Sequence, residues 1–268
     1  MLFGHPRGHY HFLQGIDPYS CGVIADPGYE IVHVTLARAL PWREGFDRID
    51  AHLKAQCFIS RTTDTSRSDT ACRQALCAIE LRSPAPFTMQ GFIDFNRKYC
   101  AVLQKWDLYV GEHNPVARTN VAPIDLSHDA IRPPSEPVLH AFSYVVSNDQ
   151  IDRQTLIVAG AGELREGILI AEGIIRPGDT SSESMREKAA YVMRVMDQRL
   201  KGLGGEWDLI NAIDVYTIFP LEGIFEDILL PTMGPAHRHG IRWIYTRPPV
   251  VDIDFEMDLH GVVSERII

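Results

Sequence analysis

The sequence predicts an α+β protein built from two tandem domains, each a sheet with helices packed on one face. Residues 125–137, DLSHDAIRPPSEP, are polar and rich in proline, which marks a loop at the centre of the chain. On both sides of this loop the segments follow the same order: strand, helix, strand, helix, strand, strand. Grouped strands with helices on one face favour a sandwich architecture. We place the boundary near residue 148, giving domains 1–148 and 149–268.

The first half contains a strand-rich segment, a helix, a second strand and a second helix, at residues 28–41, 44–58, 75–81 and 87–104. Strand candidates also flank the central loop. Both helices repeat apolar residues at helical spacing: Phe46, Ile49, Leu53 and Cys57 in the first, and Phe92, Phe95, Tyr99 and Val102 in the second.

The second half begins with a strand at residues 154–164 that runs into a glycine-rich turn. Residues 182–205 form the clearest helix, with an apolar stripe and a stop at Gly204 and Gly205. A strand, a short helix broken by Pro231 and two last strands follow, at residues 209–219, 220–233 and 240–263. Each sheet would leave one face bare, so another copy or another chain must cover that face.

The composition is that of a soluble globular protein, with 45% hydrophobic and 23% charged residues among 268. A net charge of −9 without a dense Lys/Arg run argues against a nucleic-acid partner. No apolar run reaches the roughly 18 residues needed to span a membrane, and the start does not resemble a secretory signal. Five scattered cysteines predict reduced thiols and a cytoplasmic location, with Cys72 and Cys77 as small core residues.

Several short motifs, in order, resemble the RidA (YjgF) family of enamine and imine deaminases. They are IDPYSCGV at 16–23, FIDFNRKY at 92–99, NPVARTNV at 114–121, LIVAGAGEL at 156–164 and VDIDFEMDLHG at 251–261. The resemblance covers nearly the whole chain as two divergent copies, and the two-copy form is similar to deaminases of the 2-aminomuconate type. It implies RidA-like sandwich domains, a homotrimer that is a pseudo-hexamer of domains, and sites in clefts between copies.

The resemblance assigns family roles to Tyr19, Asn96 and Arg118 in the first half, and to Gly160 and Glu256 in the second. Neither copy is complete. In the first half, His140 takes the place of the acidic residue, and Ala37 and Arg38 replace the family's serine and glycine. In the second half no asparagine occupies the helix position, and the arginine is represented at best by Arg242. One kind of cleft could therefore be active and the other degenerate.

Arg118 suits a carboxylate handle, because a guanidinium is always charged and its planar fork matches a carboxylate with two hydrogen bonds. The alternative is a salt bridge at a strand end. Glu256 suits proton handling: it alternates with apolar residues, which places it with Asp254 and Asp258 on one sheet face. That face could simply be solvated, but a neighbouring copy covering it would raise one carboxyl pKa towards neutrality.

His140 is the second candidate for proton transfer, since imidazole titrates near neutral pH, although a lone strand histidine is more often a core or interface residue. Asn96 and Tyr19 would orient polar groups of the substrate, and Tyr19 could equally be core packing. Gly160 would allow a ligand close to the backbone, or is a plain turn glycine. Three further cations could hold a second carboxylate: Arg38, Arg242 and Arg247.

Neither a metal nor an organic cofactor is expected. The histidines at 5, 9 and 11 and at 237 and 239 lack cysteine partners and a helical spacing with a carboxylate. The stretch GAGELREG lacks the full dinucleotide pattern. The leading hypothesis is a deaminase that hydrolyses an enamine or imine carboxylate in aromatic-compound degradation. Its rivals are a non-catalytic protein that binds a small carboxylate, and a hydrolase of the chorismatase type.

Overall fold

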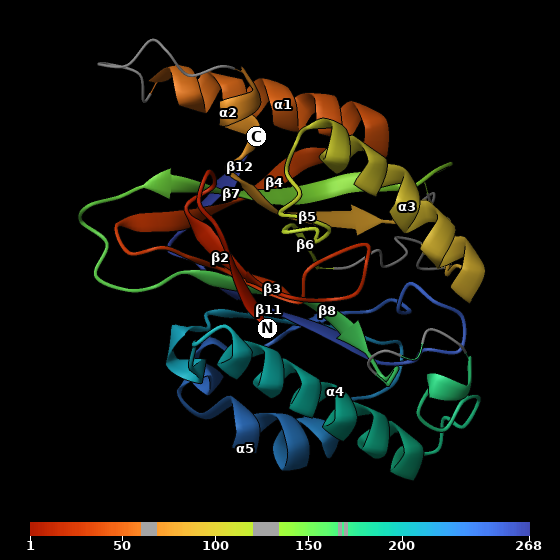
Figure 1. Ribbon diagram of the computed structural model, residues 1–268. Coiled ribbons are helices and arrows are strands. Elements are labelled where there is room, and N and C mark those ends of the chain that lie inside the picture. Colours follow the sequence, from red (N-terminus) through yellow and green to blue (C-terminus); the bar gives the residue numbers. More distant parts are fainter. Residues whose placement is uncertain (60–68, 120–133, 166–167, 169–170) are drawn as a thin grey trace.

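A computed structural model describes residues 1–59, 69–119, 134–165, 168 and 171–268. Two β-sheets face each other at the centre, and a layer of helices covers the outer side of each (Figure 1). The five-stranded sheet has the order β12-β4-β7-β5-β6. Its strands are β4 (Tyr29–Pro41), β5 (Leu76–Arg82), β6 (Ala117–Arg118), β7 (Val138–Ser147) and β12 (Ser264–Ile267). Its helices are α1 (Trp42–Ile59), α2 (Asp69–Arg73) and α3 (Met89–Lys105).

The seven-stranded sheet has the order β1-β2-β3-β8-β11-β9-β10. Its strands are β1 (Leu2–His5), β2 (Tyr10–Leu13), β3 (Gly22–Ala25), β8 (Leu156–Gly162), β9 (Ala212–Tyr216), β10 (Arg242–Ile244) and β11 (Glu256–Gly261). The long helix α4 (Ser182–Gly202) and the short α5 (Leu230–Met233) lie on its outer face (Figure 1). Short helical turns complete this half: Ala171–Gly173, Trp207–Leu209, Phe225–Leu229 and Gly234–His239.

Local signals in the sequence explain where α3 and α4 begin and where α4 ends. Thr88 caps α3 by accepting a hydrogen bond from the Gly91 amide, and Ser181 caps α4 by accepting one from the Ser184 amide. Helix α4 ends where Gly204 adopts a φ of 80°, a left-handed conformation that glycine reaches without strain. The predicted stop of this helix is therefore confirmed.

The core has three parts, and the middle one holds the two sheets together. One apolar cluster lies under α1 and α3, and a second lies under α4. The third contains residues from the facing sides of both sheets, including Phe12, Val23 and Ile157 from one and Ile31 and Val145 from the other. Each sheet therefore covers the face that the other would leave bare, within a single chain.

The predicted α+β class is confirmed, and every strand and helix predicted from periodicity is present. However, the strands at each end of the chain join the sheet that is built mainly from the other half. The N-terminal strands β1, β2 and β3 extend the sheet of second-half strands, where β3 pairs with β8. The C-terminal β12 pairs in parallel with β4 of the other sheet. The expected homotrimer stays a prediction. Among the described residues, no helix combines the length and apolar character that crossing a bilayer requires.

The expectation of five reduced cysteines is corrected by the structure, because Cys57 at the end of α1 and Cys72 in α2 form a disulfide. Cys21, Cys77 and Cys100 are free and buried. Sequence spacing gave no indication of this pair, since helix packing brings the two residues together.

We expect denatured, unreduced protein to react as three thiols with a thiol reagent, and five after reduction. The disulfide closes a 15-residue separation, so the Cys57→Ser/Cys72→Ser double variant should lose about 3 kcal/mol of unfolding free energy. Chemical denaturation measures this loss. Five thiols before reduction would contradict the disulfide, and Cys21→Ser is the control that removes a cysteine without breaking a cross-link.

Candidate active site

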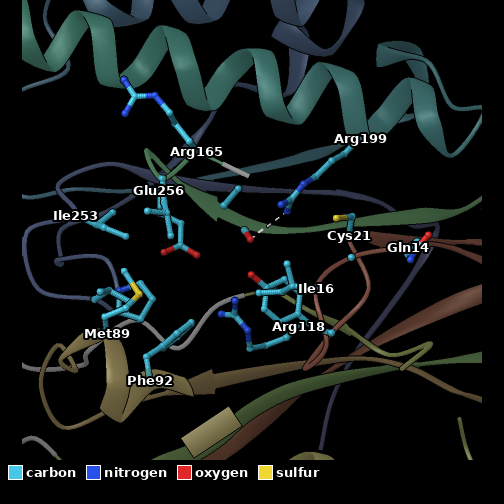
Figure 2. Close-up of a pocket in the computed structure, with 18 residues that line it drawn as sticks. Gln14, Ile16, Cys21, Met89, Phe92, Arg118, Arg165, Arg199, Ile253 and Glu256 are labelled. Carbon is cyan, nitrogen blue, oxygen red and sulfur yellow. Dashed lines mark hydrogen bonds between the residues drawn. The ribbon is translucent and has the colours of Figure 1, made fainter. Parts of the chain in front are cut away.

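A cavity of about 320 Å³ lies between the two sheets and is lined by residues from both halves of the chain. This size is within the range of small-molecule sites. Figure 2 shows Glu256 and Arg118 entering the cavity from opposite sides. Four of the residues predicted from sequence line it: Tyr19, Arg118, Gly160 and Glu256. The halves that each looked incomplete thus contribute complementary residues to one site.

Arg118 ends the short strand β6, which pairs with β5 and so places the side chain at the inner edge of the five-stranded sheet. The residue is 2% exposed, yet its Nε and Nη1 have no hydrogen-bond partner among the described residues. The guanidinium carbon lies 4.3 Å from the centre of the Tyr19 ring and 4.9 Å from that of Phe92. Aromatic faces attract the cation but leave Nε and Nη1 without an acceptor. A buried guanidinium with unused N–H groups is suited to binding an anion.

Tyr19 is held under Arg118 by a cluster of hydrogen bonds to the residue before it. The Pro18 carbonyl oxygen accepts from Asn114 Nδ2 at 2.8 Å, from Cys100 Sγ at 3.1 Å and from the Tyr99 hydroxyl at 3.3 Å. These donors come from α3 and from the segment leading into β6. The loop that carries Tyr19 is therefore fixed to the elements that carry Phe92 and Arg118.

Glu256 begins β11 in the seven-stranded sheet and is 3% exposed. Burial raises the pKa of its carboxyl group to about 7, and the nearby charge of Arg118 partly opposes this shift. The sheet face that carries Glu256 is covered by the other sheet of the same chain at the cavity. A group with this pKa exchanges protons readily at neutral pH, as acid–base catalysis requires.

The backbone leading into Glu256 is fixed by buried charges. Glu163 accepts hydrogen bonds from the backbone amides of Asp254 and Phe255, at 2.6 and 3.0 Å. Lys188 of α4 is fully buried and pairs with Asp254 and Glu163, with Nζ–O distances of 2.5 and 3.6 Å. Asp254 therefore does not share the environment of Glu256, although alternation grouped the two acids on one face.

Gly160 lines the cavity, so the approach of a ligand to its backbone stays a prediction, and the residue also lies at a close contact between the two sheets. A Cβ atom here would lie 1.6 Å from the Thr119 carbonyl oxygen and 2.6 Å from Glu256 Oε1. The glycine thus allows the segment following Arg118 to press against β8 beside Glu256. It sets the distance between the two sheets at the cavity.

Gly160→Ala should therefore separate Arg118 from Glu256 and lower the free energy of unfolding by about 1–3 kcal/mol, as overpacking does. Substrate turnover should fall together with stability. Gly4→Ala is a suitable control, because its nearest contact would be the flexible His11 ring at 3.3 Å. Chemical denaturation and steady-state kinetics measure the effects, and a Gly160→Ala protein with wild-type stability and turnover would contradict the close contact.

Arg199 lines the cavity and was missed from the sequence. It extends from α4, and its Nη1 donates to the carbonyl oxygens of Ala159 and Gly160 at 3.0 and 3.3 Å, as one dashed line in Figure 2 marks. It fixes the strand that faces Arg118, and its charge lowers the Glu256 pKa somewhat. The sequence pattern did indicate that Arg199 is buried, because it lies three residues after Met196 and four before Leu203, on the apolar stripe of the helix.

Three predicted site residues do not line the cavity. Asn96 is buried one helical turn after Phe92, and both polar atoms of its side chain lack partners among the described residues. Arg242 pairs with Asp214, with Nη2 donating to Oδ2 at 2.8 Å. His140 lies near Arg242 and other charges, and burial together with the charge of Arg82 lowers its pKa to about 4. His140 is therefore a neutral imidazole at pH 7, in a different polar cluster from Arg118.

Comparison with known proteins gives a match over nearly the entire chain. The model of a family described as 2-aminomuconate deaminase CnbZ matches residues 2–266. A 2-amino-5-chloromuconate deaminase from Comamonas testosteroni is 38% identical over 269 residues, which cover 97% of this chain and 96% of that protein. Among solved structures, TM0215 from Thermotoga maritima has a TM-score of 0.31 at 13% identity, covering 41% of this chain and 80% of that one. The YjgF gene product of E. coli has a TM-score of 0.27 at 14% identity, covering 40% and 80%.

Proposed function

The chain belongs to the 2-aminomuconate deaminase CnbZ family, and on that premise we propose that it hydrolyses an enamine or imine carboxylate of the 2-aminomuconate type and releases ammonia. Membership of this family confirms the resemblance to 2-aminomuconate-type deaminases stated from sequence. The proposed reaction takes place in aromatic-compound degradation and uses no organic cofactor.

The observation that carries the proposal is the pairing of Arg118 with Glu256 across one buried cavity. The unused N–H groups of Arg118 provide the carboxylate handle. The carboxyl group of Glu256, with its pKa of about 7, provides proton transfer on the opposite side. A substrate carboxylate bound at Arg118 would hold the adjacent imine carbon, one bond away, between the two residues.

In the proposed mechanism, ionised Glu256 accepts a proton from water as the water oxygen bonds to the imine carbon. The carboxyl group then passes that proton to the substrate nitrogen, which completes a carbinolamine. In the second step Glu256 moves the proton of the carbinolamine hydroxyl to the nitrogen, the C–N bond breaks and ammonia leaves. The products are a ketone and ammonia, and Glu256 returns to its ionised form.

The second carboxylate of a muconate-type substrate needs its own cation. Arg38, Arg242 and Arg247 were the sequence-based candidates, but none of them lines the cavity. Arg165 does line it and is exposed, so we assign this role to Arg165. Arg165 Nη1 donates to one backbone carbonyl, that of Glu172, at 3.3 Å. Arg199 is less suited, because it is buried and its Nη1 donates to two backbone carbonyls.

The proposal is tested by incubating the purified protein with 2-aminomuconate and measuring ammonia with a coupled glutamate dehydrogenase assay. We expect ammonia and the oxo acid in equal amounts, at a rate above that of buffer. Arg118→Ala protein under the same conditions is the control for adventitious deaminase. If substrate binding depends on Arg118 but no ammonia forms, the chain is a carboxylate-binding protein instead of an enzyme.

A further inference from the structure

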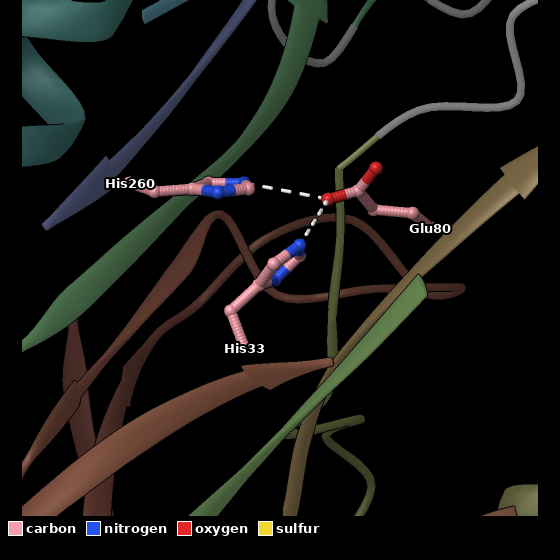
Figure 3. A group of neighbouring side chains, drawn as sticks. All are labelled: His33, Glu80 and His260. Atoms are coloured by element: carbon pink, nitrogen blue, oxygen red, sulfur yellow. Dashed lines mark ion pairs between the residues drawn. The ribbon is translucent and has the colours of Figure 1, made fainter. Parts of the chain in front are cut away.

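A second group of polar side chains lies between the sheets, away from the cavity: His33 on β4, Glu80 on β5 and His260 on β11 (Figure 3). All three are buried, with exposed fractions of 6%, 5% and 1%. None of them lines the cavity that holds Arg118 and Glu256. They come from both sheets, and the proposed deamination uses none of them.

The distances within this group are too long for hydrogen bonds but suit ligands around one ion. Glu80 Oε1 lies 3.6 Å from His33 Nε2 and 3.6 Å from His260 Nε2, beyond the usual length of a hydrogen bond. All three atoms are within 4.8 Å of one another. Ligands about 2.1 Å from a tetrahedral zinc ion are separated by about 3.4 Å. A cation placed among the three atoms would therefore require only small side-chain shifts.

Hydrogen bonds around the group orient its side chains. His33 Nδ1 lies 3.1 Å from the Ser143 hydroxyl, a contact that orients the ring. His33 Nε2 then lies 3.6 Å from Glu80 Oε1 and 3.5 Å from the Thr35 hydroxyl, a long contact that a bound ion would replace. The other oxygen of Glu80 accepts from Arg82 Nη2 at 3.2 Å, which leaves Oε1 facing both histidines, as Figure 3 shows. Metal-binding histidines commonly use their second nitrogen in this way.

His260 provides an independent indication. The residue is only 1% exposed, and neither ring nitrogen has a hydrogen-bond partner among the described residues. Leaving a buried polar group unpaired is costly, so such a group needs a partner. The Asp258 carboxylate, 3.8 Å away, adds negative charge beside His260.

We propose that His33, Glu80 and His260 bind a divalent transition-metal ion that links the two sheets. Two imidazoles and a carboxylate are a ligand set used for zinc and its neighbours in the first transition row. The ion would connect β4 and β5 of one sheet to β11 of the other, four residues after Glu256 in the chain. Its role is to fix the sheet interface, and the proposal holds whether or not 2-aminomuconate is the substrate.

The test uses the full chain and Zn²⁺ as the probe. Wild-type protein is incubated with Zn²⁺, desalted and analysed by inductively coupled plasma mass spectrometry, both as purified and after loading. We expect about one zinc ion per chain after loading, and a several-fold decrease in His260→Gln and in Glu80→Gln. His239→Gln, which changes an exposed histidine, should retain the wild-type amount.

Cobalt gives a second readout that does not depend on activity. Co²⁺-loaded wild-type protein should show visible absorption of a four- or five-coordinate site, and His260→Gln should not. Circular dichroism and gel filtration check that each variant is folded. Wild-type protein that retains no zinc after loading would overturn the proposal, even if every variant failed to fold. Equal zinc in wild-type and folded His260→Gln protein would overturn it as well.

Discussion

Arg118→Lys is expected to lower kcat/KM for 2-aminomuconate by about 10²-fold, and Arg118→Ala by about 10³-fold, mainly through a higher KM. Lysine keeps the positive charge but loses the planar fork, so it cannot give two parallel hydrogen bonds to one carboxylate. The guanidinium also lies over the Tyr19 and Phe92 rings. The smaller ammonium group of lysine would not fill the space between them. Initial rates of ammonia release over a range of substrate concentrations measure both constants.

Arg194→Lys is the matched control, because Arg194 is exposed on α4 and does not line the cavity. It should leave kcat and KM unchanged. Thermal denaturation in the absence of substrate must show that the Arg118 variants are folded. An unchanged KM in folded Arg118→Lys protein would mean that Arg118 is a structural cation and that the carboxylate binds elsewhere.

The sequence predicts the central strands and covering helices well, because these elements bury one continuous apolar stripe or face. It does not predict the exchange of terminal strands. In β2 the alternation of Tyr10 and Phe12 with exposed His11 was present but spans only four residues. The edge strand β12 is mostly exposed and carries no hydrophobic pattern. Its place beside β4 is determined by backbone pairing between this C-terminal strand and a strand of the first half.

The site was predictable to the extent that motif order assigned Tyr19, Arg118, Gly160 and Glu256. What sequence could not provide was the pairing of the two halves, which depends on how the sheets face each other. That arrangement places Arg118 in the same cavity as Glu256, and it places Arg242 near His140. Charges within the apolar stripe of α4, Lys188 and Arg199, were a readable signal of buried polar roles. No comparable sequence signal pointed to the group of His33, Glu80 and His260, because these residues are distant from one another in sequence.

Glu256→Gln is expected to lower kcat by about 10²–10⁴-fold, the usual contribution of a positioned acid–base group. Glutamine keeps nearly the same shape and should not disturb the contact with Gly160, but it cannot take a proton from water. KM should change little, since Arg118 still holds the carboxylate. Glu222→Gln, which alters an exposed acid, is the control and should behave as wild type in the same ammonia assay.

The pH dependence separates proton transfer from a merely structural role for Glu256. Its folded-state pKa of about 7 means that the carboxyl group is ionised above pH 7 and protonated below. Because the ionised form accepts the proton from water, wild-type kcat/KM should fall about tenfold per pH unit as the pH decreases below 7. Glu256→Gln should lose this acidic limb while keeping its low rate. If the variant retained the limb with the same midpoint, another group would carry the proton. A wild-type profile that instead fell above pH 7 would assign the first step to the protonated acid, which suits donation to an enamine carbon.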